Sequence, residues 1–233
     1  PELVISGTQF SARGMVDLEA KEIANVGVAA LDGNALLTAE YDIIGSTVTS
    51  SENATLTATN GSIIDTSVTA SKVADLTAAT GTISGSMVTA GSTADLTAQL
   101  IADTGVVANG DITTSGSLLN SSLATMANIV ISNAPLIDNL DATSAGTITA
   151  VATPPTGTIG LITGGSFISG LTTTIEAESI RGTAFDASDM VLTASNDIQG
   201  ITARVATNAK LNSAKIVDSD VMVSMASAGG IQV

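Results

Sequence analysis

The sequence predicts an all-β, single-domain fold, a parallel β-solenoid of about 11–12 coils with 19–20 residues in each. Three observations predict it. Leucines recur at steps of 19 and 20 residues, apolar and polar residues alternate around these leucines, and the chain of 233 residues is 44% hydrophobic but only 2% aromatic. We expect successive coils to stack in parallel at about 4.8 Å, as a right-handed β-helix.

The leucine register defines the coils. Its steps are 19, 19, 20 and 20 residues between Leu18, Leu37, Leu56, Leu76 and Leu96, and it returns later at Leu192 and Leu211. We predict one continuous solenoid over residues 1–233, with regular coils over 14–99, irregular coils with loops over 100–175, and regular coils over 176–233. Pro135 and the pair Pro154 and Pro155 indicate the loops, since proline is poorly tolerated inside a central strand.

Within one unit, Val68, Ala70, Ala74 and Leu76 alternate with polar residues. A period of two indicates β-strands, which Thr, Val and Ile favour, and Gly, Asn and Ser supply the turns. We expect about three short strands per coil. Helical repeats need about 34–47 residues and strong helix formers, so they are disfavoured. A thin coil filled by small aliphatic residues also explains the low aromatic content.

The composition excludes several chemistries. The chain has no Cys and no His, which excludes Ser-His-Asp and Cys-His nucleophiles, Cys/His zinc sites, iron–sulfur clusters and disulfides. Seven basic residues against 22 acidic residues, with no base between 73 and 180, argue against a nucleic-acid partner. No run approaches the ~18 apolar residues of a membrane span. The absence of Cys fits an exported protein, and Pro1–Ile5 suggests a mature or excised segment.

Paired carboxylates are the first candidates for chemistry. Asp75 and Asp95 occupy equivalent positions in adjacent coils, beside Thr55 of the preceding coil, which places them roughly 5 Å apart. This spacing suits a retaining glycosidase pair, but two solvated residues beside a core leucine are the favoured interpretation. Glu176 and Glu178 alternate around Ala177, and we expect them on a solvated face.

Metal and ice binding are the remaining site hypotheses. Asp218 and Asp220 are the tightest acidic pair, but neither calcium-binding loop pattern occurs. An ice-binding face needs Thr pairs at the same position in consecutive coils. The Thr pairs of this chain are Thr47/Thr49, Thr55/Thr57, Thr147/Thr149 and Thr172/Thr174. Thr55 is replaced by Asp75 and Asp95 in the next two coils, which argues against such a face. The Asn-x-Ser/Thr triplets at Asn53, Asn60 and Asn120 are interpreted as turn residues. We expect no catalytic, cofactor-binding, metal-binding or nucleic-acid-binding residue and no enzyme.

The repeat A-x-L-T-A-x-x-G-x-I-x-x-x-x-V-T-A, at residues 74–90, resembles those of filamentous haemagglutinin-like exoproteins. The match covers about residues 14–99, with a weaker return at 186–225. The resemblance implies the right-handed β-helical shaft of a secreted bacterial adhesin. The secretion-domain motifs of that family are missing, which fits a shaft fragment or a distinct short protein.

The ends of the sequence suggest a function. Neither end carries an amphipathic helix to cap the solenoid, and Leu3–Ile5 and Val221–Val223 are strand-like. We expect an extracellular or cell-surface structural subunit that binds itself head to tail in a filament, sheath or surface layer. A shaft fragment of a secreted adhesin is the alternative; a polysaccharide-acting enzyme and an ice-binding solenoid rank below it. Cell-surface polysaccharide or another surface protein is a further expected partner.

Overall fold

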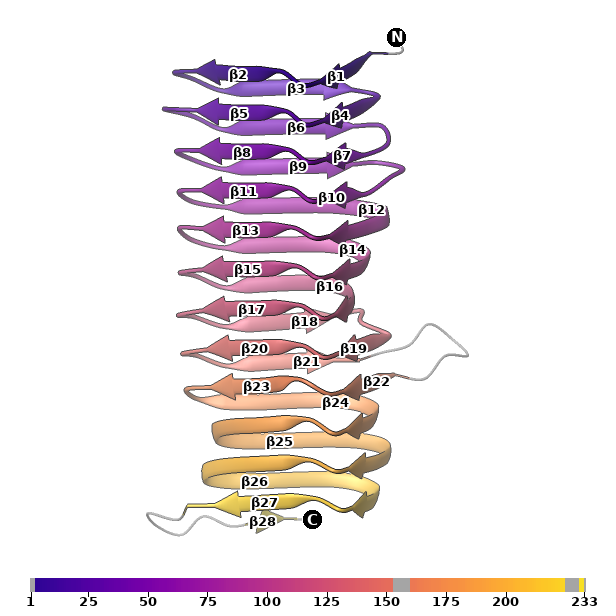
Figure 1. The fold of residues 1–233 in the computed structure, drawn as a ribbon. Coiled ribbons are helices and arrows are strands. Elements are labelled where there is room, and N and C mark those ends of the chain that lie inside the picture. Colours follow the sequence, from indigo (N-terminus) through magenta and orange to yellow (C-terminus); the bar gives the residue numbers. More distant parts are fainter. Residues whose placement is uncertain (1–2, 153–159, 225–230, 233) are drawn as a thin grey trace. The chain divides into compact units, whose positions relative to one another are not determined.

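A computed structural model describes residues 3–152, 160–224 and 231–232, in which every regular element is a β-strand. The chain is all-β, and its strands form a parallel β-solenoid of about 11 turns (Figure 1). The predicted fold class is therefore confirmed. The chain divides into two compact units, unit 1 at Pro1–Ser115 and unit 2 at Gly116–Val233.

The strands of unit 1 are short, with two longer exceptions. Their bounds are β1 Val4–Ser6, β2 Gln9–Ala12, β3 Val16–Ala20, β4 Glu22–Ala24, β5 Gly27–Ala30, β6 Ala35–Ala39, β7 Ile43–Ile44, β8 Thr47–Ser50, β9 Ala54–Ala58, β10 Ile63–Ile64, β11 Ser67–Ala70, β12 Ala74–Ser84, β13 Met87–Ala90, β14 Ala94–Ala102 and β15 Gly105–Ala108. The next strand, β16 Ile112–Leu119, contains the boundary between the units.

Three consecutive strands of unit 2, β24 to β26, are long, and the others are short. Their bounds are β17 Ser122–Thr125, β18 Ile129–Ser132, β19 Leu136–Asp138, β20 Asp141–Ser144, β21 Ile148–Val151, β22 Leu161–Thr163, β23 Ser166–Ser169, β24 Thr172–Arg181, β25 Ala184–Gln199, β26 Thr202–Val217, β27 Asp220–Val223 and β28 Ile231–Gln232. No helix in the described residues is long and apolar enough to cross a membrane.

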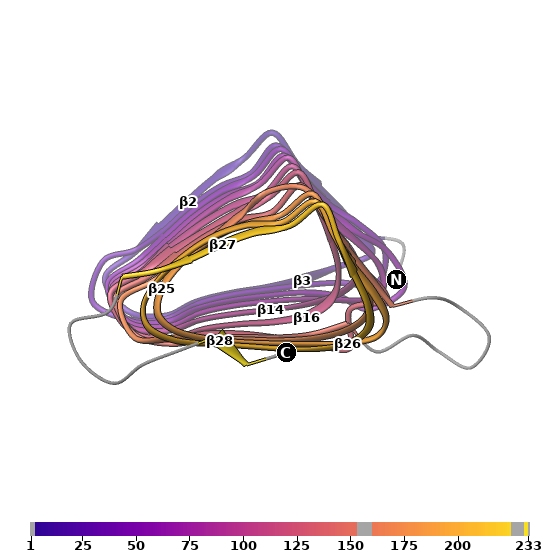
Figure 2. The same cartoon turned by 90° about the horizontal axis from the view of Figure 1, so that it is seen from below.

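Each turn of unit 1 runs along three faces, which Figure 2 shows end-on as a three-sided course. The first face pairs β1 with β4, β4 with β7 and β7 with β10. The second face pairs β2, β5, β8, β11, β13 and β15 in order, and the third pairs β3, β6, β9, β12 and β14. All of these pairs are parallel, because each strand returns to the same face one turn later.

The core of unit 1 consists of identical residues stacked in register. Leu18 pairs with Leu37, and the pairing continues through Leu56, Leu76 and Leu96, as the sequence predicts. Leu37, Leu56 and Leu76 have no exposed surface. Isoleucine and valine columns fill the other two faces in the same way, at Ile23, Ile43, Ile63, Ile83 and Ile101, and at Val28, Val48, Val68, Val88 and Val106.

The core of unit 2 keeps the register but varies the residues. Leu192 pairs with Leu211, as predicted. Phe167 and Phe185 are buried and stacked, with ring centroids 5.6 Å apart. Their register neighbours are Ala142 on one side and Ala203 on the other. The thin coil therefore accommodates phenylalanine where small neighbours leave the volume for it.

A left-handed residue marks one corner of each turn. In unit 1 these residues have φ between 49° and 62°, and they are Gly7, Asn25, Gly45, Asp65, Gly85 and Asp103; in unit 2 they are Asn120, Asn139, Gly164, Gly182, Gly200 and Asp218. Gly, Asn and Asp adopt this conformation at the lowest energetic cost. A buried hydroxyl follows in several turns of unit 1: Ser46 donates to the Ile44 carbonyl, 3.1 Å away, and accepts from the Val26 amide.

The three asparagine triplets lie between strands, as the sequence predicts. Asn53 accepts a hydrogen bond from the Val73 amide of the next turn, at 3.2 Å. Asn120 is one of the left-handed corner residues, and Asn60 lies between β9 and β10. Pro135 also lies between strands, before β19, whereas Pro154 and Pro155 are outside the described residues.

Candidate binding grooves

The aspartates singled out in the sequence lie side by side on the outer third face of unit 1. Asp75 of β12 pairs in register with Asp95 of β14 and with Thr55 of β9. Burial raises the pKa of Asp75, and the negative charge of Asp95 raises it further, while a hydrogen bond from Thr77 lowers it. The two carboxylates are therefore adjacent as predicted, and their proximity is electrostatically unfavourable.

The threonine array is interrupted at the predicted place. Thr38, Thr57, Thr77 and Thr97 form one in-register column on β6, β9, β12 and β14. The neighbouring column on the same strands runs Leu36, Thr55, Asp75 and Asp95. Charge therefore breaks the two-column pattern that an ice-binding face needs.

Among the residues that the structure describes, Asp218 and Asp220 belong to no cluster of acids that could hold a metal ion. Asp218 is a left-handed corner residue with φ 48°, and Asp220 begins β27, its amide donating to the Ile201 carbonyl. Within the described ranges, no group of three or more acidic side chains is close enough to hold a metal ion. Asp218 thus forms part of the turn, and the backbone of Asp220 takes part in the hydrogen-bond ladder.

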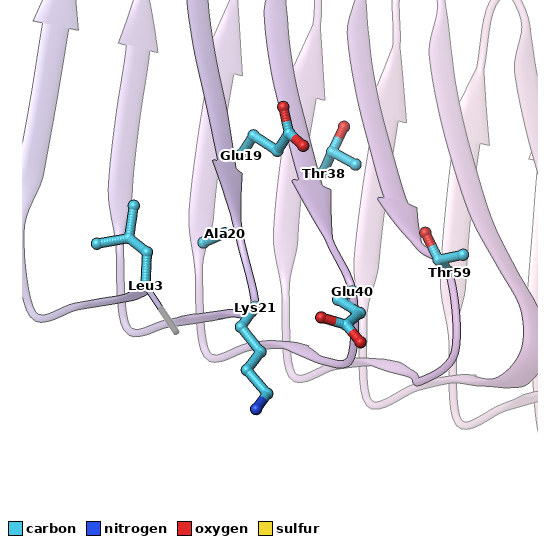
Figure 3. A pocket seen from close by; sticks show the side chains of 7 residues that line it. All are labelled: Leu3, Glu19, Ala20, Lys21, Thr38, Glu40 and Thr59. Atoms are coloured by element: carbon cyan, nitrogen blue, oxygen red, sulfur yellow. The ribbon is translucent and has the colours of Figure 1, made fainter. Parts of the chain in front are cut away.

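A groove of about 530 Å³ opens at the corner after β3 and β6 in unit 1. We call it groove 1. Figure 3 shows its side chains across successive turns, and they are Leu3, Glu19, Ala20, Lys21, Thr38, Glu40 and Thr59. Glu19 and Thr38 are register partners on β3 and β6, whereas Lys21 and Glu40 follow the ends of these strands. The groove therefore contains two carboxylates, two hydroxyls and one ammonium group.

An aromatic ring lies next to groove 1. The Nζ atom of Lys21 is 5.6 Å from the centre of the Tyr41 ring. This distance is within the range of a cation–π interaction. Tyr41 directly follows Glu40 and is 42% exposed. The ammonium group at this groove is therefore drawn toward the ring.

Glu176 and Glu178 line a second groove, of about 480 Å³, in unit 2. We call it groove 2. Glu176 of β24 pairs in register with Thr193 of β25, which pairs with Asn212 of β26. The remaining lining residues are Ala152, Ala177, Ala194, Ser195, Ser213 and Ala214. The two glutamates thus share a concave surface with hydroxyl and amide groups. Glu176 is exposed, as predicted, whereas Glu178 is half-buried.

A third cleft in unit 2, of about 310 Å³, has more apolar walls. It is lined by Pro135, Leu136, Leu161, Ser179, Arg181 and Asn196. Arg181 forms an ion pair with Asp197 at 3.0 Å. The neighbouring Ser179 hydroxyl lowers the pKa of Asp197, and Arg181, which donates hydrogen bonds to its carboxylate, lowers it further. Arg181 is thereby held against the carboxylate at the edge of this cleft.

Glu19, Lys21 and Glu40 of groove 1 were not among the sequence candidates. A signal for them was present in the repeat. Glu19 directly follows Leu18, as Glu176 follows Ile175, and both glutamates precede an alanine. Comparing the outward positions beside each core residue would have singled out both glutamates, but not the hollows beside them.

No model of a known protein family matches the chain, and no curated protein or solved structure shows significant similarity to it. The description of the fold and of the grooves therefore depends on the residues themselves. The resemblance to filamentous haemagglutinin-like exoproteins stays a prediction, as does the absence of enzymatic activity.

Proposed function

We propose that the chain is a non-enzymatic structural protein of the bacterial cell exterior, a β-solenoid subunit that stacks end to end into a filament, sheath or surface layer. The observation that carries this proposal is the parallel ladder of unit 1, in which each strand pairs with its counterpart one turn later, so that a further turn can be added by the same pairing. In the described part of the chain, β1, β2 and β3 pair only with β4, β5 and β6. An edge of this kind is a template for a strand from another molecule.

The first described turn also exposes apolar side chains. Ile5 and Phe10 of this turn are only half-buried, whereas their register partners in the next turn, Ile23 and Val28, are buried. A coil of a neighbouring copy would cover these side chains and continue the backbone ladder, which the hydrophobic effect favours. Because the two contacting surfaces differ, such a contact is heterologous and propagates into a fibre.

Negative charge on the sides of unit 1 favours end-on contact over lateral contact. Asp17, Asp75 and Asp95 project from the third face, and the whole chain carries a formal net charge of −15. Copies that approach side by side along this face therefore repel each other.

A proline in β2 tests the proposal. The carbonyls of Thr8 and Ala12 accept from Gly27 and Leu31 of the next turn, so the alternation of a strand directs the Ser11 amide to the open side. Ser11→Pro removes that donor. We expect light scattering to show that the average molar mass of the wild-type particles rises with protein concentration. The Ser11→Pro variant should have a lower average molar mass than wild type at the same concentration.

Ser11→Thr is the matched control, since it keeps the amide and should assemble like wild type. Equal masses for all three proteins at every concentration would sink the proposal. Far-ultraviolet circular dichroism checks that each variant is folded.

A shaft segment of a secreted adhesin is the second candidate, favoured by the repeat at residues 74–90 that forms β12 and β13. In that case another turn of the same polypeptide covers β1–β3 in the whole protein. Purified chain would then stay monomeric, and its amides in β1–β3 would exchange with deuterium faster than those in β8 or β11.

A further inference from the structure

Grooves 1 and 2 occupy the same position of the repeat in their respective units. In groove 1, Glu19 follows the core residue Leu18 and pairs in register with Thr38. In groove 2, Glu176 follows the core residue Ile175 and pairs in register with Thr193. A glutamate on one turn is therefore stacked on a threonine of the next turn in both places.

The hollow has the same origin in both units. The position after each glutamate or threonine is an alanine, at Ala20 and Ala39 in unit 1 and at Ala177 and Ala194 in unit 2. Ala39, Ala177 and Ala194 are buried. β3 and β6 end at Ala20 and Ala39, and the register of β24 and β25 shifts after Ala177 and Ala194. Both grooves therefore lie where the regular ladder is interrupted.

Each groove also has a second carboxylate and a third polar row. Glu40 and Thr59 provide them in groove 1, and Glu178 and Asn212 provide them in groove 2. Polar groups from successive turns are spaced at about 4.8 Å along the stack. This arrangement fits an extended ligand that presents hydrogen-bonding groups at intervals along its length.

We propose that grooves 1 and 2 bind neutral polysaccharide, with the chain of sugars crossing successive turns. Carboxylates accept hydrogen bonds from sugar hydroxyls, and the threonine hydroxyls both donate and accept. In groove 2 the Asn212 amide adds donors and an acceptor. Sugar hydroxyls, which are themselves donors and acceptors, match this set without carrying charge.

The charge of the grooves selects against other ligands. Two carboxylates in each groove repel anionic polysaccharides. Calcium requires six to eight oxygen ligands, whereas the described residues hold no cluster of three acids. Lys21 places a positive charge in groove 1, which disfavours polyamines there. Only a neutral, hydroxyl-rich ligand suits both grooves.

This inference rests on the proposed extracellular role, because polysaccharide is met at the cell surface. Its test is separate from the assembly test. Ser11 lines neither groove, so groove variants can lose binding while assembly persists, and Ser11→Pro can lose assembly while binding persists.

Titration followed by nuclear magnetic resonance tests the proposal. The probes are cellohexaose and maltohexaose as neutral sugars, hexagalacturonate as the anion, and spermidine and calcium chloride as cations. We expect a neutral hexasaccharide to shift the amide signals of residues 19–21 and 176–178, with a dissociation constant on the order of 1 mM. Hexagalacturonate should leave them in place.

Glu19→Ala and Glu176→Ala should each weaken binding at their own groove about tenfold and leave the other groove unchanged. Asp17→Ala and Thr174→Ala are the matched controls, because these residues lie two positions earlier on the same strands and outside both linings. Shifts with spermidine or calcium alone would overturn the proposal, as would the absence of shifts with both neutral sugars or an equal loss in the control variants.

Discussion

Left-handed corner residues show how single positions limit the sequence of this chain. Gly45 and Gly85 alternate with Asn25, Asp65 and Asp103 at the same corner of unit 1. A side chain added at Gly85 would run into the Asp65 carboxylate of the preceding turn. An alanine at position 85 would therefore be strained by the positive φ, and the Asp65 carboxylate would have to move aside.

Gly85→Ala should lower the free energy of unfolding by at least about 1–2 kcal/mol, the cost of a left-handed L-residue. Gly14→Ala is the control, because Gly14 lacks a positive φ and a Cβ there meets open space. Urea unfolding followed by circular dichroism measures both. Equal midpoints for the two variants would contradict the corner assignment.

The adjacent carboxylates of Asp75 and Asp95 predict a pH-dependent effect. Burial and the Asp95 charge raise the pKa of Asp75 above its value of 3.8 in the unfolded chain. Folding therefore favours the protonated form of Asp75. The resulting contribution to the free energy of unfolding is present below the pKa of the unfolded chain and is lost as the pH rises through the pKa of the folded chain. The pair therefore destabilises the protein at neutral pH.

Asp95→Asn should raise the free energy of unfolding at pH 7 by up to about 1 kcal/mol, the usual range for like charges directly opposite each other. The gain should vanish below about pH 3, because protonation of Asp75, whose pKa is raised, removes one of the two interacting charges. Asp17→Asn serves as the comparison, since its register partner is Leu36. Urea unfolding of wild type and both variants at pH 7 and at pH 3 measures the effect. If Asp95→Asn remained more stable than wild type at pH 3, the electrostatic explanation would be refuted.

At the scale of strands, stacked leucines hold the turns together. Leu56 has no exposed surface and lies between Leu37 and Leu76. Leu56→Ala should cost about 2–5 kcal/mol, because the rigid columns on both sides cannot close the cavity. Leu31 is 56% exposed, so Leu31→Ala should change stability by less than about 0.5 kcal/mol. Calorimetry or urea unfolding measures this contrast.

The strand register could be predicted from the sequence, but the strand lengths could not. Leu18, Leu37, Leu56, Leu76 and Leu96 repeat the same residue at each turn, so their pairing follows from spacing alone. By contrast, β25 and β26 each run for 16 residues through corners where short strands were expected. Whether a corner keeps its ladder depends on backbone geometry, which the residue pattern does not state.

For the grooves, too, only part of the structure could be predicted from the sequence. The outward position of Glu176 could be predicted from its alternation with Ala177. That Glu176 faces Thr193 and Asn212 in a hollow could not be predicted, because it depends on how the register shifts after Ala177 and Ala194. Likewise, the adjacency of Asp75 and Asp95 followed from the period, whereas the partial burial of Asp75 needed the structure.

For the whole molecule, the central claim is that turns of one copy continue the ladder of the next. The chain provides about 11 turns of parallel β-solenoid, and β1–β3 offer an unpaired edge among the described residues. In the proposed assembly, the stacking direction of the turns would also be the long axis.

X-ray diffraction from aligned assemblies of the purified chain tests this claim most directly. We expect a reflection at about 4.8 Å along the long axis, since the spacing between stacked strands then repeats in that direction. Assemblies with the 4.8 Å reflection perpendicular to the long axis, or a chain that forms no assemblies at high concentration, would contradict end-to-end stacking.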